Sequence, residues 1–153
     1  MSVTKIVSGG QTGADRGALD AALALGIPHG GWCPKGRIAE DGRVPDRYAL
    51  VETQSTDYNV RTRLNVQDAD ATVIFVVHMT PGSMTTSMWC RQLGKPHVVI
   101  ANVVAKQAAA LERLLIWLWR YKPKTLNVAG SRESRAPGIA GAVERIMFAA
   151  LKR

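Results

Sequence analysis

The sequence predicts an α/β fold, a Rossmann-like three-layer α/β/α sandwich with a mostly parallel sheet. Short strand-like runs alternate along the chain with longer helix-like segments, which is the pattern of repeated βαβ units. The run over residues 71–77 is continuous and rich in β-branched residues, as expected of a central parallel strand that is covered on both faces. The chain has 153 residues, of which 46% are hydrophobic, and neither a linker nor a repeat divides it. We therefore expect a single ligand-binding domain over residues 1–153.

Each element is predicted from its own local pattern. Apolar and β-branched runs predict strands over residues 3–7, 30–33, 48–53, 71–77, 97–101 and 125–129. Apolar residues at helical spacing predict helices over residues 14–25, 57–69, 85–93, 105–121 and 138–152. Gly26 and Gly94 end the first and third of these helices. The stretch 34–47 carries two prolines and two glycines, so we expect it to be a loop.

Two of the predicted helices carry expectations about buried side chains. The helix over residues 57–69 is expected to bury Val60, Leu64 and Val66. The helix over residues 105–121 has one apolar face, which is formed by Leu111, Leu114, Leu115 and Leu118. It also carries Trp117 and Trp119, and we expect one of the two to face outward, where a large apolar side chain often marks a subunit contact. In the alternative, both tryptophans belong to the core.

Charge and composition exclude several function classes. Twenty Lys and Arg against twelve Asp and Glu give a net charge of +8, which favours anionic partners. The cationic residues are spread along the chain without a zinc-finger or RNA-binding motif, so we do not expect a nucleic-acid partner. Cys33 and Cys90 lack CxxC spacing, and we expect no metal site. We also expect a cytoplasmic location and no membrane contact, because the apolar runs are far shorter than the ~20 residues of a membrane span and a glycine loop begins at Gly9.

The loop after the first predicted strand is a candidate ligand site, because ligands of open parallel sheets bind beyond the carboxyl ends of the strands. Glycines let the backbone approach a ligand, and free N–H groups at a helix start favour an anion. The candidate binding residues of this loop are Gly9, Gly10, Gln11, Thr12, Gly13, Asp15 and Arg16. No Walker lysine follows the loop, and no acidic residue ends the second strand, so dinucleotide binding is not predicted. Asp15 alone could simply stabilise the start of the helix.

Two further loops follow later strands and should reach the same edge of the sheet. The loop over residues 81–87 crowds hydroxyl groups at a helix start, with Gly82, Ser83, Thr85 and Thr86 as candidate ligand-binding residues. One hydroxyl suffices to cap the helix, so simple capping is the alternative. The loop after the last strand offers Ser131, Arg132, Glu133 and Ser134. Its arginine and hydroxyls suit a phosphate group, although the same residues would also suit a solvated turn.

Several of these motifs together resemble a known family. They are SGGQTGAD at residues 8–15, GWCPKGR at 31–37, AEDG at 39–42, DADAT at 68–72 and GSRES at 130–134. The chain resembles the molybdenum carrier family, a circularly permuted YpsA-like branch of the lysine-decarboxylase-like (LOG) Rossmann superfamily. The resemblance implies a Rossmann-like fold that binds a nucleotide or a phosphorylated pterin such as the molybdenum cofactor. It also implies a homo-oligomer.

Nucleotide phosphoribohydrolases of the wider superfamily carry the motif PGGxGTxxE after the central strand and an arginine before it. Arg61 lies where the family's arginine would lie. The motif itself is matched in part: Pro81, Gly82 and Thr86 agree, Ser83 and Thr85 replace glycines, and Trp89 replaces the glutamate. Because hydrolysis of an N-glycosidic bond needs a carboxylate near the ribose, the loss of this glutamate argues against an enzyme. A carboxylate from elsewhere could substitute, the candidates being Asp15, Glu40, Asp41 and Glu133.

The remaining candidates have a functional and a structural interpretation. Arg61, Asn65 and Asp68 share one helical face, which either reaches the ligand or is a solvated stripe. Lys35 and Arg37 are expected to hold a distal phosphate. Trp32 either stacks on a planar ring or packs in the core.

Three hypotheses follow. In the first, the protein is a non-enzymatic carrier-like protein, without an intrinsic cofactor, that binds a small phosphorylated ligand such as a nucleotide or molybdopterin. In the alternative, it is a nucleoside 5′-monophosphate phosphoribohydrolase that uses Arg61 and a displaced carboxylate. In the third hypothesis, the protein is a nucleic-acid-binding module. This hypothesis predicts that the protein binds generic DNA and that the affinity falls steeply as the salt concentration rises.

Overall fold

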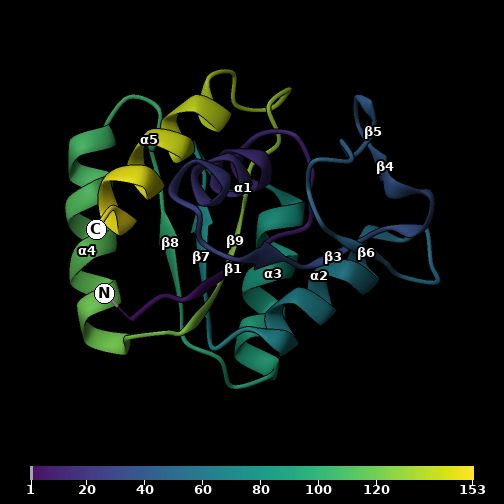
Figure 1. Cartoon of the computed structure of the whole chain (residues 1–153), viewed down its shortest axis with the longest axis horizontal. Coiled ribbons are helices and arrows are strands. Elements are labelled where there is room, and N and C mark those ends of the chain that lie inside the picture. Colours follow the sequence, from purple (N-terminus) through teal and green to yellow (C-terminus); the bar gives the residue numbers. More distant parts are fainter. Residues whose placement is uncertain (1) are drawn as a thin grey trace.

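The computed structural model describes residues 2–153 and confirms the predicted α/β fold (Figure 1). Its main sheet has five strands in the order β2-β1-β9-β7-β8, and all four pairings are parallel. The strands are β1 (Lys5–Val7), β2 (His29–Gly30), β7 (Ala71–Phe75), β8 (His97–Ile100) and β9 (Thr125–Gly130). Every residue of β7 is buried, in agreement with its expected central position.

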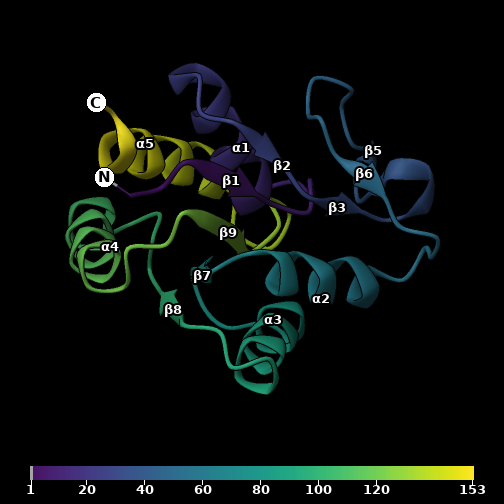
Figure 2. The same cartoon turned by 60° about the horizontal axis from the view of Figure 1, so that its bottom comes forward.

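Helices cover both faces of this sheet (Figure 2). On one face lie α1 (Ala14–Leu25), α4 (Gln107–Tyr121) and α5 (Ile139–Leu151), and on the other lie α2 (Tyr58–Asp68) and α3 (Pro81–Gln92). The main core fills the space between the sheet and the first group, where α1 packs closely against α5. Apolar burial on this face is the dominant stabilising contribution.

The order of the strands creates a crevice at one edge of the sheet. From β1 the chain crosses through α1 to β2, whereas from β7 it crosses through α3 to β8 on the opposite side of the sheet. Strand β9 lies between β1 and β7, with Val7 paired to Asn127 and Phe75 paired to Gly130. Ligands of such sheets bind at the carboxyl ends of the strands where the crossovers diverge. The loops that follow β1, β7 and β9 meet at this point.

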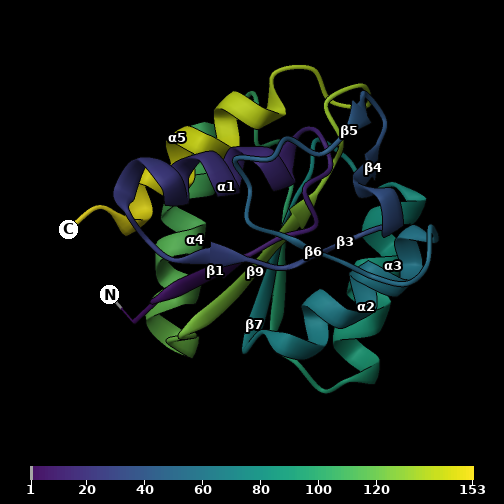
Figure 3. The ribbon, with the colours of Figure 1, turned by 45° about the vertical axis from the view of Figure 1, so that its right-hand side comes forward.

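A strap, defined here as residues 31–56, projects beside the sheet (Figure 3). It holds β3 (Trp32–Cys33) paired with β6 (Val51–Glu52), a 3₁₀ turn η1 (Lys35–Arg37), and a hairpin of β4 (Ile38–Ala39) and β5 (Gly42–Arg43). A second apolar cluster joins the strap to α1, formed by Leu19, Cys33, Ala39, Val44, Tyr48 and Leu50. The strap is thus a packed part of the fold.

Four expectations about the elements were wrong. Residues 30–33 form two short strands in different sheets, because Gly31 turns the backbone between them with φ at 125°. The expected strand over 48–53 shrinks to β6, and the expected loop over 34–47 contains the η1 turn and the β4–β5 hairpin. Helix α3 begins at Pro81 rather than at residue 85, because Thr80 caps it and proline is well suited to the first helical turn.

The buried faces of two helices also differ from expectation. Helix α2 buries Arg61, Asn65 and Val66, while Val60 and Leu64 are only half-buried, because this helix turns a polar face toward the crevice. On α4, Leu114 and Leu118 are buried as expected, but Leu111 is half-buried and Leu115 is exposed. The outward tryptophan is confirmed, since Trp119 is 75% exposed and Trp117 only 8%. In the part of the chain that the structure describes, no helix is long and apolar enough to cross a bilayer.

Candidate functional site

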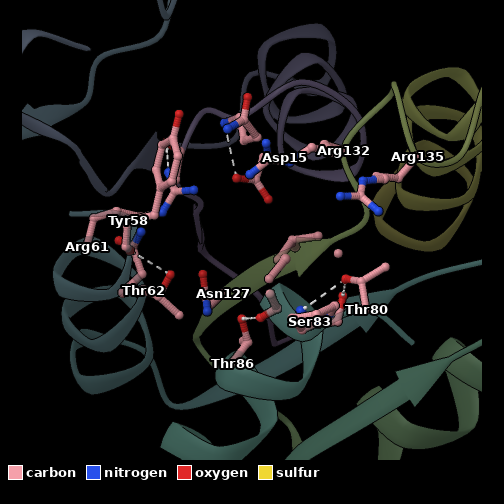
Figure 4. Close-up of a pocket in the computed structure, with 18 residues that line it drawn as sticks. Asp15, Tyr58, Arg61, Thr62, Thr80, Ser83, Thr86, Asn127, Arg132 and Arg135 are labelled. Carbon is pink, nitrogen blue, oxygen red and sulfur yellow. Dashed lines mark hydrogen bonds between the residues drawn. The ribbon is translucent and has the colours of Figure 1, made fainter. Parts of the chain in front are cut away.

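The carboxyl ends of β1, β7 and β9 open onto a pocket of about 270 Å³ (Figure 4). Its walls come from the loop after β1, the start of α1, helix α2, the start of α3, and β9 with its following loop. The lining residues are Gly9, Gln11, Asp15, Tyr58, Arg61, Thr62, Asn65, Thr80, Pro81, Gly82, Ser83, Thr86, Asn127, Val128, Ala129, Gly130, Arg132 and Arg135. The pocket therefore lies where the strand order predicts a ligand.

Arg61 forms the inner wall on the side of α2. Its side chain is buried, and Nη1 donates a hydrogen bond to the carbonyl oxygen of Gly9 at 2.7 Å. A Cβ atom at position 9 would collide with this guanidinium, so glycine is required for the arginine to lie against the loop. Burial lowers the pKa of the Arg61 guanidinium, with Asp15 opposing this effect. The group still carries a positive charge near neutral pH, because its ordinary pKa lies far above 7.

Asp15 brings a buried carboxylate into the first turn of α1. Its Oδ2 accepts a hydrogen bond from the backbone N–H of Gln11 at 3.1 Å. Burial raises the pKa of this carboxyl, and the positive charge of Arg61 offsets part of that effect. Acids with perturbed pKa values in a pocket are common at functional sites. Among the residues that the structure describes, Asp15 is the one acidic residue that lines the pocket.

Gln11 has a side-chain amide whose orientation is fixed. Its Oε1 accepts hydrogen bonds from the backbone N–H groups of Thr12, at 3.1 Å, and Glu40, at 3.0 Å. Flipping the amide would break both bonds, so Nε2 is held in place as a donor. The residue is only 5% exposed, and Nε2 finds no hydrogen-bond partner within residues 2–153. Because unpaired buried donors are rare, this atom marks a position that suits an acceptor.

The N-terminus of α3 forms another wall. The Thr80 hydroxyl accepts a hydrogen bond from the backbone N–H of Ser83 at 3.4 Å, and the first turn carries no acidic side chain. The hydroxyl of Thr86 donates to the carbonyl oxygen of Gly82 at 3.2 Å. Figure 4 shows Thr80 and Ser83 across the cavity from Asp15. A helix start with free N–H groups and no acid attracts an anion.

Two arginines from the loop after β9 complete the cationic lining. Arg132 Nη1 lies 3.8 Å from Glu40 Oε2, and its guanidinium carbon lies 5.6 Å from the centre of the Tyr58 ring. Arg135 follows three residues later, and Figure 4 shows it on the side of the cavity away from Arg61. Arg132 lies closer to Arg61, because the Arg61 guanidinium carbon is 5.1 Å from the centre of the same Tyr58 ring. Within the described residues, three guanidinium groups thus face one carboxylate around the pocket. This balance favours a negatively charged ligand.

The structure brings together nine of the residues that the sequence predicts as ligand-binding. These are Gly9, Gln11, Asp15, Arg61, Asn65, Gly82, Ser83, Thr86 and Arg132. In the described chain, the pocket lining leaves out Gly10, Thr12, Gly13, Arg16, Lys35, Arg37, Thr85, Ser131, Glu133 and Ser134. Ligand binding by either group stays a prediction.

Most residues of the second group have structural partners. Arg16 forms a bidentate ion pair with Asp41 across the strap. Arg37, expected to hold a phosphate, instead donates to the carbonyl oxygens of strap residues, namely Val44, Pro45, Tyr48 and Leu50. Lys35 is exposed in the η1 turn. Such contacts fix the strap rather than line the pocket.

The loop residues around position 133 are also engaged with the protein. The Glu133 carboxylate accepts from the backbone N–H groups of Gly138 and Ala140 at the start of α5. Ser134 donates from its hydroxyl and its backbone N–H to Glu40, and the Thr12 hydroxyl donates to the same carboxylate. Burial tends to raise the pKa of Glu40, but these hydrogen bonds outweigh it and lower the pKa.

Trp32 and Trp89 turn away from the pocket lining. The indole Nε1 of Trp32 donates to Asp68 Oδ2 at 2.8 Å, and that of Trp89 donates to Asn59 Oδ1 at 2.8 Å. Neither tryptophan lines the pocket within residues 2–153. The position of the superfamily glutamate is thus taken up by contacts between α2 and α3.

Sequence reasoning missed several lining residues. Tyr58 precedes Arg61 by one helical turn, and its ring centre lies 5.1 Å from the Arg61 guanidinium carbon. Asn127 is a polar residue within an apolar strand, and its Nδ2 donates to Thr72 Oγ1 at 3.2 Å. Thr80, Thr62 and Arg135 were also missed. Asn127 offered a usable signal, because a buried polar residue in a central strand needs a partner or a function.

The parallel sheet with its divergent crossovers and the cationic pocket at its carboxyl edge define a Rossmann-like α/β domain. The sequence model of the circularly permutated YpsA SLOG family matches residues 6–151, and the chain belongs to this family. The chain is also similar to a protein from Syntrophus aciditrophicus SB, known from a 1.45 Å crystal structure and named "putative molybdenum carrier protein". The two share 41% identity with a TM-score of 0.93, over 98% of this chain and 96% of the other. Curated proteins give no match.

Proposed function

We propose that the protein is a molybdenum carrier-like binding protein whose pocket takes a small phosphorylated ligand, a nucleotide or a molybdopterin. One observation carries the proposal, namely the convergence of Arg61, Arg132 and Arg135 with the N-terminus of α3 on a single pocket. Guanidinium groups and helix N-termini are the two protein features that bind phosphate most readily. The name of the similar crystal structure supports the molybdopterin option for this chain.

The phosphate is expected at the α3 end of the pocket. Gly82 and Ser83 line this end, and the first turn of α3 supplies backbone N–H groups without an acidic neighbour. The side chains of Arg132 and Arg135 supply positive charge from the facing loop. The pocket volume of about 270 Å³ lies close to the lower bound for small-molecule sites, which suits a ligand of mononucleotide size.

A titration with AMP, followed by calorimetry, tests the proposal. We expect Arg132→Ala and Arg135→Ala each to weaken the binding of AMP by about tenfold, because each removes one charge from the lining. Arg113→Ala is the matched control, since Arg113 is exposed on α4 and does not line the pocket of the described chain. Unchanged affinity in both pocket variants would overturn the proposal. Native mass spectrometry of gently purified protein would then show whether any ligand is carried.

Self-association is part of the proposed carrier. The outer face of α4 exposes Leu115, Ile116, Trp119 and Tyr121. Large apolar groups that gather on one face often mark a protein contact. Sedimentation analysis of the wild type and of Trp119→Lys tests this, because a homo-oligomer formed through α4 dissociates in the variant. A wild type that sediments as a monomer at all concentrations would contradict it.

Hydrolysis of a nucleoside monophosphate is a second candidate, favoured by the position of Asp15. This carboxylate lines the pocket together with Arg61, so the pocket does contain an acid although Trp89 replaces the superfamily glutamate. A carboxylate beside a ribose can stabilise the positive charge that develops as the base departs. Incubation with AMP or GMP tests the idea by the release of free base. Base release that persists in Asp15→Asn would exclude this carboxylate as the catalyst.

A further inference from the structure

We propose that Tyr58 is a positioning residue of the pocket, whose ring holds the side chain of Arg132 where an anion can reach it. The inference rests on the proposed function, because it concerns how one arginine of the same pocket is kept in place. It is carried by two observations: one aromatic ring lies beside two guanidinium groups, and Arg132 has no hydrogen bond that would fix it to the described part of the chain.

The first observation concerns the guanidinium group of Arg132. The residue lines the pocket, and this group donates no hydrogen bond within residues 2–153. An arginine has five N–H donors, so all five are available to a ligand. In the described chain the group is held by weaker contacts on two sides. Its Nη1 lies 3.8 Å from Glu40 Oε2, and its carbon lies 5.6 Å from the centre of the Tyr58 ring.

Arg61 is held in a different way, although it touches the same ring. Its guanidinium carbon lies 5.1 Å from the centre of the Tyr58 ring, and Figure 4 shows both residues on the α2 side of the cavity. The side chain of Arg61 is buried, and its Nη1 donates to the carbonyl oxygen of Gly9 at 2.7 Å. The side chain of Arg132 is 38% exposed and has no such bond. We therefore expect loss of the ring to move Arg132 and to leave Arg61 in place.

The second observation is that the two guanidinium groups repel each other. Burial is the main cause of the lowered pKa of Arg61, and the positive charge of Arg132 lowers this pKa further. The face of an aromatic ring carries partial negative charge and attracts a cation within about 6 Å of its centre. The ring of Tyr58 thus offsets part of the repulsion. It keeps Arg132 close to Arg61 before an anion arrives, which lowers the cost of ordering this side chain on binding.

The ring of Tyr58, rather than its hydroxyl group, makes these contacts. The hydroxyl has no partner within residues 2–153, and the bond between Tyr58 and the Thr62 hydroxyl uses the backbone carbonyl oxygen of Tyr58. Tyr58→Phe keeps the ring, whereas Tyr58→Leu removes it and keeps an apolar side chain. The first variant is therefore the matched control for the second. Inorganic phosphate is the probe, because it has no planar ring that could stack on position 58 directly.

A double-mutant cycle with inorganic phosphate, measured by ³¹P NMR, tests the proposal. We expect Tyr58→Leu to weaken phosphate binding about threefold, because the cation–π contact that prepares Arg132 is lost. Tyr58→Phe should bind phosphate as the wild type does. In the Arg132→Ala background, Tyr58→Leu should cause no further loss. An equal loss in both backgrounds would show that Tyr58 acts without Arg132 and would overturn the proposal.

A second measurement needs no ligand and separates this inference from the proposed function. Protons above the face of an aromatic ring resonate upfield, so the side-chain protons of Arg132 report on the Tyr58 ring in NMR spectra of the free protein. We expect the upfield shift in the wild type and in Tyr58→Phe, and its loss in Tyr58→Leu. If the shift is present but phosphate does not bind the wild type, the proposed function fails and the placement of Arg132 by Tyr58 stands. If the Arg132 resonances are the same in all three proteins, the inference is overturned whatever the phosphate affinity.

Discussion

The pocket lies between the N-termini of two helices that differ in how their free N–H groups are satisfied. Helix α1 starts after Gly13 without a side-chain cap. The N–H of Ala14 donates instead to the carbonyl oxygen of Ser131 at 3.0 Å. Asp15 adds a carboxylate to the first turn. Helix α3 starts after Thr80, whose hydroxyl caps it, and its first turn carries no acid. One helix thus has an internal anion, and the other has none.

This difference shows how one fold element can serve two chemical purposes. Both helices present the positive end of their dipole to the pocket. At α1 the protein neutralises that end with Asp15 and packs it tightly against the loop after β9. At α3 the end stays open toward the cavity. An external anion is therefore favoured at α3 and disfavoured at α1.

The largest expected effect comes from glycine substitutions at the two helix starts. A Cβ atom at Gly13 would collide with the backbone of Ser131 and Glu133, and its φ of 86° is unfavourable for other residues. At Gly82, a Cβ atom meets no atom of residues 2–153 within 4 Å. We expect Gly13→Ala to lower the free energy of unfolding by roughly 2–4 kcal/mol, and Gly82→Ala to change it by less than about 1 kcal/mol, with stabilisation the favoured direction.

Urea unfolding followed by circular dichroism measures both variants of this pair. If the start of α1 is tightly packed and the start of α3 is open, the urea concentration at the midpoint of unfolding falls strongly for Gly13→Ala alone. The slope of the transition stays unchanged. Similar midpoints for the two variants would show that the ends are equally accessible, and the comparison would fail.

The elements of the main sheet were predictable because their signals are local. A continuous apolar run identified β7, and helical spacing identified α1, α4 and α5. The strap was not predictable, because its two-residue strands are fixed by tertiary contacts such as the carbonyl oxygens gathered around Arg37. The start of α3 was misplaced because hydroxyl residues that resemble a loop are equally compatible with a capped helical turn.

The residues of the candidate site that directly follow a strand could be predicted from the sequence. Gly9, Asp15 and Ser83 lie in loops or helix starts that the topology brings to one edge. Tyr58 and Arg135 lie in segments whose distance from the pocket depends on how α2 and the last loop pack. Sequence spacing does not encode that packing. The same reason explains Arg37, whose charge suggested a phosphate and whose geometry serves the strap.

The next expected effect concerns the pH dependence at the α1 end. The pKa of Asp15 is raised above its ordinary value of 3.8, chiefly by burial. A carboxyl with a raised pKa in the folded state favours folding at low pH, and this contribution is lost as the pH rises from about 3.8 through the folded-state pKa. We therefore expect Asp15→Asn to gain stability relative to the wild type as the pH rises through this window. Thermal melts at several pH values measure the difference, and a constant difference would contradict the prediction.

For Glu40, which joins the strap to the loop before α1, we expect the opposite pH dependence of stability. Burial tends to raise its pKa, but hydrogen bonds from Ser134 and Thr12 hold it below the ordinary value of 4.5. The stability that Glu40 contributes is therefore present above about pH 4.5 and lost as the pH falls through the folded-state pKa. We expect Glu40→Gln to cost about 1–2 kcal/mol at pH 7 and less in acid. Unfolding at pH 7 and pH 3 measures it, and a larger cost in acid would exclude the assigned role.

The smallest effect is expected from removal of the side-chain cap of α3. Thr80→Ala removes the hydroxyl that accepts from the Ser83 N–H, and we expect it to lower the free energy of unfolding by about 0.5–1 kcal/mol. Thr85→Ala is the matched control, because the Thr85 hydroxyl only donates to the carbonyl oxygen of Pro81 inside the helix.

If the α3 end is the anion site, added phosphate recovers part of the loss in Thr80→Ala, because the ion accepts from N–H groups that the variant leaves free. Thermal melts with and without phosphate measure this recovery. Equal stabilisation of both variants by phosphate would place the anion away from the helix start.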